Sequence, residues 1–245
     1  MDVISIIPAR SGSKGIPNKN LKEVGGKSLL EWSIKASLKT RGINRTIVST
    51  DSEEYALLAI EMGAEVPLLR PKELAQDSSP DLDFIRHTLA SLAEMNARPD
   101  LIVHLRPTTP FRDPQVIESA INEFASSRAK YSALRSVHEM SESAYKMLEI
   151  DTEGQLMQIF TKSRDIEQSN MARQSFPATF SPNGYVDVLS SDFIEMENRI
   201  HGDRVMAFIT ERVEEVDVAA DLEFLSISLD VSNVAYERVF GGPNE

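Results

Sequence analysis

Apolar positions along the chain recur with the spacings of alternating strands and helices. Leu30, Ile34 and Leu38 repeat at four-residue intervals, which is typical of a helix buried along one face. Similar patterns predict helices over 28–40, 52–62, 81–95, 114–125 and 222–229. Short apolar runs predict strands over 3–8, 45–50, 65–68, 100–105, 131–137, 185–189 and 205–209. This alternation predicts an α/β fold, a Rossmann-like and mainly parallel sheet with helices on both faces.

Boundary residues support the individual helices. Ser28 and either Asp51 or Ser52 are suitable N-caps, Gly63 can end the second helix, and Pro114 suits a first helical position. The alternation fails over 138–182, where polar residues interrupt the apolar ones. We therefore expect a single domain, 1–245, with an insertion at 138–182.

Composition limits the classes of function. The 245 residues include 26 basic and 38 acidic side chains, a formal charge of −12, which argues against binding to nucleic acid or to an anionic membrane. The absence of cysteine excludes disulfides, thiolate metal sites and cysteine nucleophiles. No segment has the pattern of a signal peptide or a membrane span, so we expect a soluble, cytoplasmic protein. His104 and Trp32 lie in apolar segments and are expected in the core.

A loop suited to phosphate follows the first predicted strand. Gly12 and Gly15 permit close backbone approach to an anion, and Arg10, Lys14 and Lys19 supply three cations within ten residues. The spacing is neither that of the P-loop nor that of the dinucleotide fingerprint. Considered alone, the loop is either a phosphate site or a solvated surface turn.

The ordered residues of 8–20 read PAR-SGSKG-I-P-N-KN, which resembles the signature of the acylneuraminate cytidylyltransferases. The resemblance covers most of the chain and is weakest over about 136–182. It implies a fold of the nucleotide-diphospho-sugar transferase type. It also implies transfer of CMP from CTP to the anomeric hydroxyl of a nonulosonic, sialic-acid-like acid, with release of pyrophosphate. The loop residues that it implies in CTP binding are Arg10, Ser11, Gly12, Ser13, Lys14, Lys19 and Asn20.

Two further motifs match the family's nucleotide side. Ser49–Glu53 reads S-T-D-S-E, in which helix capping is the main alternative for Asp51 and Ser52. The segment 69–79 reads LRP-KE-LA-Q-D-S-S, and the resemblance implies that Arg70 and Ser79 recognise cytosine. A surface turn with a solvated arginine is the alternative.

The segment 104–112, H-L-R-P-T-T-P-F-R, matches a family segment that usually reads Q-P-T-S-P-L-R. Arg106 therefore stands where the family has glutamine, and a guanidinium can hold a carboxylate or phosphate through paired N–H donors. We expect Arg106, Thr108 and Thr109 to contact the sugar acid. The alternative is that Arg106 and Arg112 only brace loops.

The segment 181–184, S-P-N-G, resembles the family's R-x-N-G. Asn183 and Gly184 are kept and are expected to contact the acid, whereas Ser181 replaces the arginine. An Asn-Gly pair is also a common turn. The substitutions at positions 106 and 181 favour an acid other than N-acetylneuraminate.

The segment 216–219, V-D-V-A, resembles the family's V-D-I-D, whose two aspartates hold Mg²⁺. Asp217 matches the first aspartate and Ala219 replaces the second. Mg²⁺ needs few protein carboxylates when phosphates and water complete its coordination, so Asp217 alone, or with Asp221 or Glu215, can suffice. An acidic pair before a helix is also a favourable capping arrangement. The resemblance assigns the catalytic roles to Arg10, Lys19 and Asp217, with Mg²⁺ as cofactor.

Several alternatives remain open. The acid can be legionaminic, pseudaminic or another modified acid rather than N-acetylneuraminate. The chain can be a nucleotidyltransferase for another nucleoside triphosphate, or, because of Ala219, a silent protein that only binds nucleotide or sugar acid. The resemblance implies a homodimer in which the insertion completes the partner's acid pocket.

Overall fold

A computed structural model of the chain describes residues 1–231 and 234–241. They form two compact units. Unit 1 comprises Met1–Ser136, Gly184–Phe208 and the described part of Val213–Glu245, and unit 2 comprises Val137–Asn183 and Ile209–Arg212. Within the described residues, no helix has the length and apolarity needed to cross a membrane.

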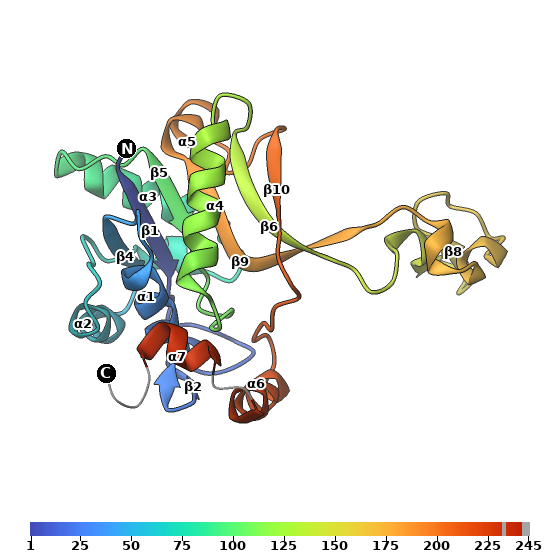
Figure 1. Cartoon of the computed structure of the whole chain (residues 1–245), viewed down its shortest axis with the longest axis horizontal. Helices are drawn as coiled ribbons and strands as arrows, with labels where there is room; N and C mark the ends of the chain where they lie inside the picture. The colour runs from blue at the N-terminus through green and yellow to red at the C-terminus, as the bar shows by residue number, and fades with distance from the viewer. Residues whose placement is uncertain (232–233, 242–245) are drawn as a thin grey trace. The chain divides into compact units, whose positions relative to one another are not determined.

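The sheet is six-stranded with the order β10-β6-β9-β5-β1-β4 (Figure 1). β1 pairs in parallel with both β4 and β5, and β9 runs antiparallel to β5. The central strands are mostly apolar because both faces of the sheet are covered, with His104 and Asp187 as buried exceptions. The strand bounds are β1 Val3–Pro8, β4 Arg45–Ser49, β5 Leu101–His104, β6 Ala133–Glu139, β9 Phe180–Ser190 and β10 Val205–Ile209.

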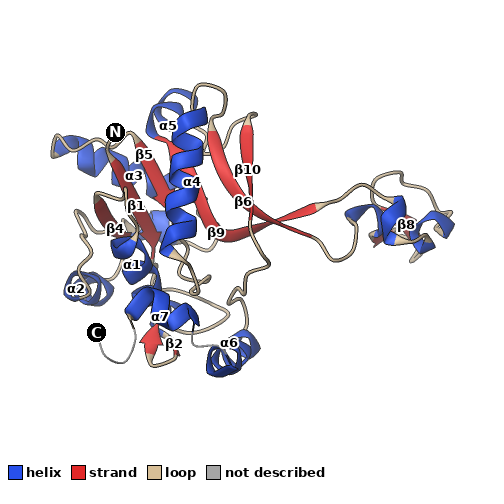
Figure 2. Ribbon diagram, viewed as in Figure 1, coloured by secondary structure: helices blue, strands red, loops and turns tan. Residues whose placement is uncertain are grey.

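Helices cover both faces of this sheet, as the sequence predicts (Figure 2). Val3 and Ile7 of β1 pack in one core with residues of α1 and α4, whereas Ile4 and Ile6 pack in a second core with α3 and α5. This division follows from the alternation of side chains along a strand. The helix bounds are α1 Leu29–Lys39, α2 Glu53–Glu61, α3 Asp81–Glu94, α4 Pro114–Ser127, α5 Ser191–Glu197, α6 Ala219–Val231 and α7 Val234–Phe240.

The predicted starts of α1, α2 and α4 are confirmed, whereas α6 begins at Ala219, three residues before the predicted start. The Ser28 hydroxyl accepts from the Glu31 amide at 3.1 Å, Ser52 caps α2, and Pro114 opens α4. The predicted strand 65–68 is wrong, because only Glu65 forms a bridge, with Ile47, and the following residues leave the sheet. The hairpin of β2 (Glu23–Val24) and β3 (Lys27–Ser28) was not predicted.

Trp32 of α1 lies in the core, as expected, with no exposed surface. Its indole N–H donates to the Val24 carbonyl at 2.9 Å, and its ring packs edge-on against Phe111, Tyr236 and Phe240. The hairpin and α7 therefore both close over this side chain.

Unit 2 contains a short antiparallel pair, β7 Leu148–Ile150 and β8 Leu156–Gln158, which reverses at Gly154 with φ +82°. Tyr145 packs against Phe160 and Phe176.

The single-turn 3₁₀ helices among the described residues of both units are η1 Lys19–Leu21, η2 Lys72–Ala75, η3 Ala144–Lys146, η4 Glu167–Asn170 and η5 Arg173–Ser175.

Candidate active site

A cavity of about 290 Å³ opens at the carboxyl ends of β1 and β5. Pro8 ends β1, and Arg106 to Thr108 follow β5. Ligands of open α/β sheets bind at this edge. The cavity brings together eight of the residues predicted for the site: Arg10, Ser13, Lys19, Asn20, Arg70, Ser79, Arg106 and Thr108.

The loop after β1 is held from both sides by polar contacts. The Asn20 side-chain amide donates to the Arg10 carbonyl at 3.0 Å. The Asp51 carboxylate accepts from the Ser11 amide at 2.8 Å and from its hydroxyl at 3.0 Å. Because Ser52 caps α2, Asp51 is free to position the loop. Gly12 is exposed and has no other residue near the position that a Cβ would take.

The loop cations Arg10 and Lys14 share one carboxylate. Asp77 lies 2.6 Å from each of them, through Oδ1 and Oδ2 respectively. The hydrogen bonds from Lys14 and Arg10 lower the pKa of Asp77 below its usual range. Two cations converging on one anion form an arrangement that can also hold a phosphate group.

Lys19 reaches the segment before α6. Its Nζ donates to the Val216 carbonyl at 2.8 Å and lies 3.7 Å from Oδ1 of Asp217. The Asp217 side chain is 78% exposed, so its carboxylate is available to a ligand. Asp221 Oδ2 instead accepts from the amides of Asp217 and Val218, at 2.7 and 2.8 Å.

These residues decide how a metal ion could fit. No cluster of three histidine or acidic side chains suited to a metal occurs among the described residues. Asp217, an exposed carboxylate beside the loop after β1, fits Mg²⁺ as a single ligand, with the remaining coordination left to phosphates and water. The capping contacts of Asp221 direct one of its oxygens to the backbone.

Arg70 lies in the wall of the cavity with 5% of its surface exposed. It donates to the Ser49 hydroxyl at 3.1 Å and to the Ser49 carbonyl at 2.6 Å, and its guanidinium lies 4.6 Å from the centre of the Phe84 ring. Burial lowers the pKa of Arg70 to about 10, so the group stays charged at neutral pH. The Ser79 hydroxyl donates to the Glu73 carbonyl at 3.2 Å.

Arg106 lies between two carboxylates. Its Nη2 donates to Asp81 at 2.8 Å, and its Nη1 donates to the fully buried Asp187 at 3.0 Å. Three more groups face Asp187 at 3.8 Å, namely His104, Arg135 and His201. The guanidinium of Arg106 is thus engaged within the protein. His104 is buried, as expected, but neither ring nitrogen has a hydrogen-bond partner among the described residues.

Arg112 braces loops, in agreement with one of the two alternatives given for it. It is 1% exposed and donates to the carbonyls of Tyr185, Arg106 and Gly184 at 2.6 to 2.7 Å, and to the Ser33 hydroxyl at 3.1 Å. It also donates to the Thr109 carbonyl. Arg112 therefore joins the loop after β5 to β9.

The residues predicted to contact the acid are placed differently from one another. Thr108 lines the cavity, whereas Thr109 is buried. A Cβ atom on residue 184 would lie only 2.5 Å from the hydroxyl oxygen of Thr109. Gly184 therefore has no room for a side chain. Asn183 belongs to unit 2, where its amide donates to the Thr210 hydroxyl at 3.0 Å.

The sequence did not predict the acidic partners of the site. Asp77, Asp81 and Asp187 each hold a site arginine. Asp77 and Asp81 flank Ser79 in sequence, and Asp187 occupies an apolar strand. A buried carboxylate in a strand is a signal for an ion-paired site, because its charge must be compensated.

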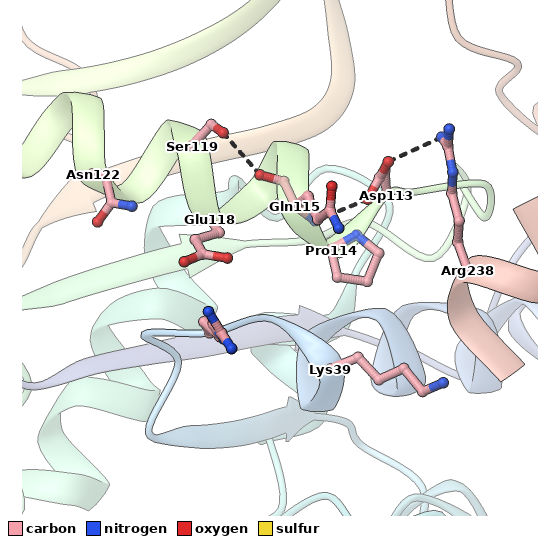
Figure 3. A pocket seen from close by; sticks show the side chains of 9 residues that line it. Lys39, Asp113, Pro114, Gln115, Glu118, Ser119, Asn122 and Arg238 are labelled. Carbon is pink, nitrogen blue, oxygen red and sulfur yellow. Dashed lines mark hydrogen bonds and ion pairs between the residues drawn. The ribbon is translucent and has the colours of Figure 1, made fainter. Parts of the chain in front are cut away.

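A second, wider hollow of about 700 Å³ lies at the start of α4 (Figure 3). Lys39, Arg41 and Arg238 line it, and Arg238 pairs with Asp113 at 2.9 Å. None of the predicted site residues lines this hollow.

The family model described as cytidylyltransferase matches residues 4–214. The chain belongs to the cytidylyltransferase family. Two curated relatives in this family are the N-acylneuraminate cytidylyltransferase of Escherichia coli and the CMP-N,N'-diacetyllegionaminic acid synthase of Legionella pneumophila. The first is 31% identical over 222 residues, 91% of this chain and 50% of the relative, and the second is 38% identical over 121 residues, 49% of this chain and 52% of the relative. The match thus spans about half the length of these relatives.

A further relative matches this cytidylyltransferase over nearly the whole length of both chains. The post-translational flagellin modification protein B of Campylobacter coli is 25% identical over 224 residues, which cover 91% of this chain and 92% of the relative.

Solved structures agree on the cytidylyltransferase fold. A CMP:2-keto-3-deoxy-manno-octonic acid synthetase complexed with CTP superposes with a TM-score of 0.70 at 16% identity, over 94% of this chain and 99% of that one. A 4-diphosphocytidyl-2C-methyl-D-erythritol synthase from Anaerococcus prevotii gives 0.60 at 14% identity, over 94% and 98%. The mainly parallel sheet with helices on both faces is therefore the fold of these two solved structures.

Proposed function

We propose that the protein transfers CMP from CTP to the anomeric hydroxyl of a nonulosonic acid and releases pyrophosphate. The observation that carries this proposal is the cavity at the strand ends, which joins the cations of the loop after β1 to a polar recess around Arg70 and Ser79. A triphosphate fits the chemistry of the cations, and a pyrimidine fits that of the recess. Membership of the cytidylyltransferase family supports CTP as the nucleotide.

The reaction asks the protein mainly for positioning and for neutralisation of charge. In the proposed reaction the sugar hydroxyl attacks the α-phosphorus in line and its proton passes to water. The bond from the α-phosphorus to the bridging oxygen breaks, and its electron pair leaves with pyrophosphate. Arg10 and Lys19 hold the phosphates and offset their charge, while Ser11, Ser13, Lys14 and Asn20 complete the loop around them. Asp217 would hold Mg²⁺, which when bound supplies further neutralisation of the triphosphate.

The proposed acid is sialic-acid-like, and the names of the relatives include sialic, legionaminic and pseudaminic acid enzymes. Arg106, Ser181 and Ala219 favour a modified acid over N-acetylneuraminate. Because the guanidinium of Arg106 is paired with Asp81 and Asp187, its influence on the acid would come through the shape and charge of the cavity wall. Thr108, Thr109, Asn183 and Gly184 remain the proposed contacts of the acid.

The proposal includes a cytoplasmic homodimer. Unit 2 presents large apolar side chains to the surface, among them Ile150, which is 70% exposed, and Phe160, which is 59% exposed. Such side chains are suited to burial against a second copy of the chain.

Pyrophosphate release tests the proposal. The full chain is mixed with Mg²⁺, each of the four common nucleoside triphosphates, and N-acetylneuraminic, legionaminic, pseudaminic or eight-carbon ketodeoxy acid. We expect release with CTP and with one or a few of these acids. Release with another triphosphate would replace CTP in the proposal, and binding of CTP without any release would favour the silent binding protein.

A further inference from the structure

Two acidic side chains line the cavity at the strand ends, and they differ in what they can offer a ligand. Both oxygens of Asp77 are taken by Arg10 and Lys14. Asp81, in the first turn of α3, gives only Oδ2 to Arg106, and its Oδ1 has no hydrogen-bond partner among the described residues. With 39% of its side chain exposed, Asp81 presents a free acceptor to the cavity.

Arg106 and Asp187 fix the position of this acceptor. Arg106 is held at 3.0 Å by Asp187, which has no exposed side-chain surface. Burial alone would raise the pKa of Asp81, but His104 and Arg106 more than offset that effect and lower it. Asp81 is therefore an ionised carboxylate, held by one oxygen and free at the other.

The surroundings of Asp81 suit the nucleobase of CTP better than the carboxyl group of the sugar acid. Arg70, Ser79 and Phe84 line the same cavity as Asp81. A carboxylate would repel the carboxyl group of a sugar acid, whereas it accepts hydrogen bonds from an amino group. Cytosine carries an amino donor at C4, and uracil carries a carbonyl acceptor at the same position.

We propose that Asp81 is a specificity-determining residue, whose free oxygen accepts from the 4-amino group of cytosine and so selects CTP over UTP. This inference rests on the proposed function, because it needs CTP in the cavity. Arg106 and Asp187 act in it as positioning residues. The carboxylate rejects UTP because it would face an oxygen that cannot donate to it.

Binding of CTP and UTP to the full chain tests this inference by titration calorimetry in the presence of Mg²⁺. Asparagine at position 81 can accept from an amino group or donate to a carbonyl. We therefore expect Asp81→Asn to lower the ratio of CTP to UTP affinity by about 10- to 100-fold, the usual discrimination of one good base contact. A merely structural role would weaken both nucleotides alike and leave the ratio unchanged.

Asp83→Asn is the matched control, since it makes the same change two residues further along α3 at a side chain outside the cavity lining. We expect it to keep the wild-type ratio.

A measurement on the wild type alone removes any dependence on how the variant folds. A CTP analogue with hydrogen in place of the 4-amino group should bind about 10- to 100-fold more weakly than CTP.

The outcomes separate this inference from the function on which it rests. Wild-type protein that binds CTP, with an unchanged ratio in Asp81→Asn or full affinity for the analogue, would overturn the role of Asp81 and leave the transfer reaction standing. Failure of the wild type both to bind CTP and to release pyrophosphate would overturn the two together.

Discussion

Lys19 joins the loop after β1 to the segment before α6, because its Nζ donates to the Val216 carbonyl and faces Asp217. Its side chain is only 16% exposed, so a phosphate held there would be partly shielded from solvent. We expect Lys19→Ala to lower the rate of pyrophosphate release about 100-fold or more, as for the loss of a charged contact to a reacting group.

Lys39→Ala is the control for Lys19→Ala. It also removes one positive charge, but from the hollow at the start of α4 (Figure 3). Equal losses in the two variants would indicate an effect of net charge and would contradict the role given to Lys19.

At the scale of single residues, the sequence predicted the cations of the site better than their partners. Arg10, Lys14 and Lys19 stand in one short segment, and its glycines mark it as a loop that permits close backbone approach to an anion. Their partner Asp77, and the carboxylates Asp81 and Asp187, come from other segments. Pairing between distant residues depends on the packing of the sheet, which no local pattern specifies.

At the scale of elements, the side chain of Arg112 links the loop after β5 to strand β9. Arg112 is buried and donates to carbonyls of both segments. Lysine cannot reproduce the fork of donors, so Arg112→Lys would leave buried carbonyls unpaired. We expect the free energy of unfolding, measured in urea, to fall by about 3 kcal/mol or more, since each unpaired buried group costs about 1–3 kcal/mol.

Arg98→Lys is the matched control for Arg112→Lys. Arg98 pairs with Asp192 and Glu195, but its side chain is 40% exposed. Such surface pairs contribute about 0–1 kcal/mol, so the change should be small. A similar loss in both variants would show that Arg112 does not brace these elements.

The central strands and the helices α1, α3 and α4 were predictable because each buries an apolar pattern. The run 65–68 failed as a strand because only Glu65 reaches β4, and Leu68 is 54% exposed. The helices α5 and α7 and the β2–β3 hairpin were missed because they are short. Their formation depends on contacts such as that of Trp32 with Tyr236 and Phe240, rather than on local pattern.

For the molecule as a whole, the buried charge of Asp187 makes stability depend on pH. Burial would raise the pKa of Asp187, but the nearby imidazoles of His104 and His201 and the charge of Arg106 lower it strongly. The unfolded carboxyl, with a pKa of about 3.9, takes up a proton before the folded one does. The stabilisation is therefore present above that pKa and is lost as pH falls below it.

We expect Asp187→Asn to be less stable than the wild type at neutral pH and to lose less stability between about pH 5 and pH 3. Urea unfolding at several pH values measures both effects. Asp203→Asn, at a side chain that is 83% exposed, should keep the wild-type dependence on pH. Parallel pH profiles for Asp187→Asn and the wild type would contradict this explanation.

The division into two units was only partly predictable. The loss of strand and helix alternation marks where the chain leaves unit 1, but Ile209–Arg212, which belongs to unit 2, begins at the last residue of a predicted strand without any such signal. The role of unit 2 in a dimer stays a prediction.

Hydrogen exchange with and without CTP and Mg²⁺ tests most directly whether the cavity at the strand ends holds the nucleotide. Bound ligand slows exchange where it contacts and orders the backbone. We predict slower exchange in peptides covering 9–21 and 70–84, and no change in those covering 113–122, at the hollow of Figure 3. Slower exchange confined to 113–122, or unchanged exchange over 9–21 at saturating CTP, would contradict the account.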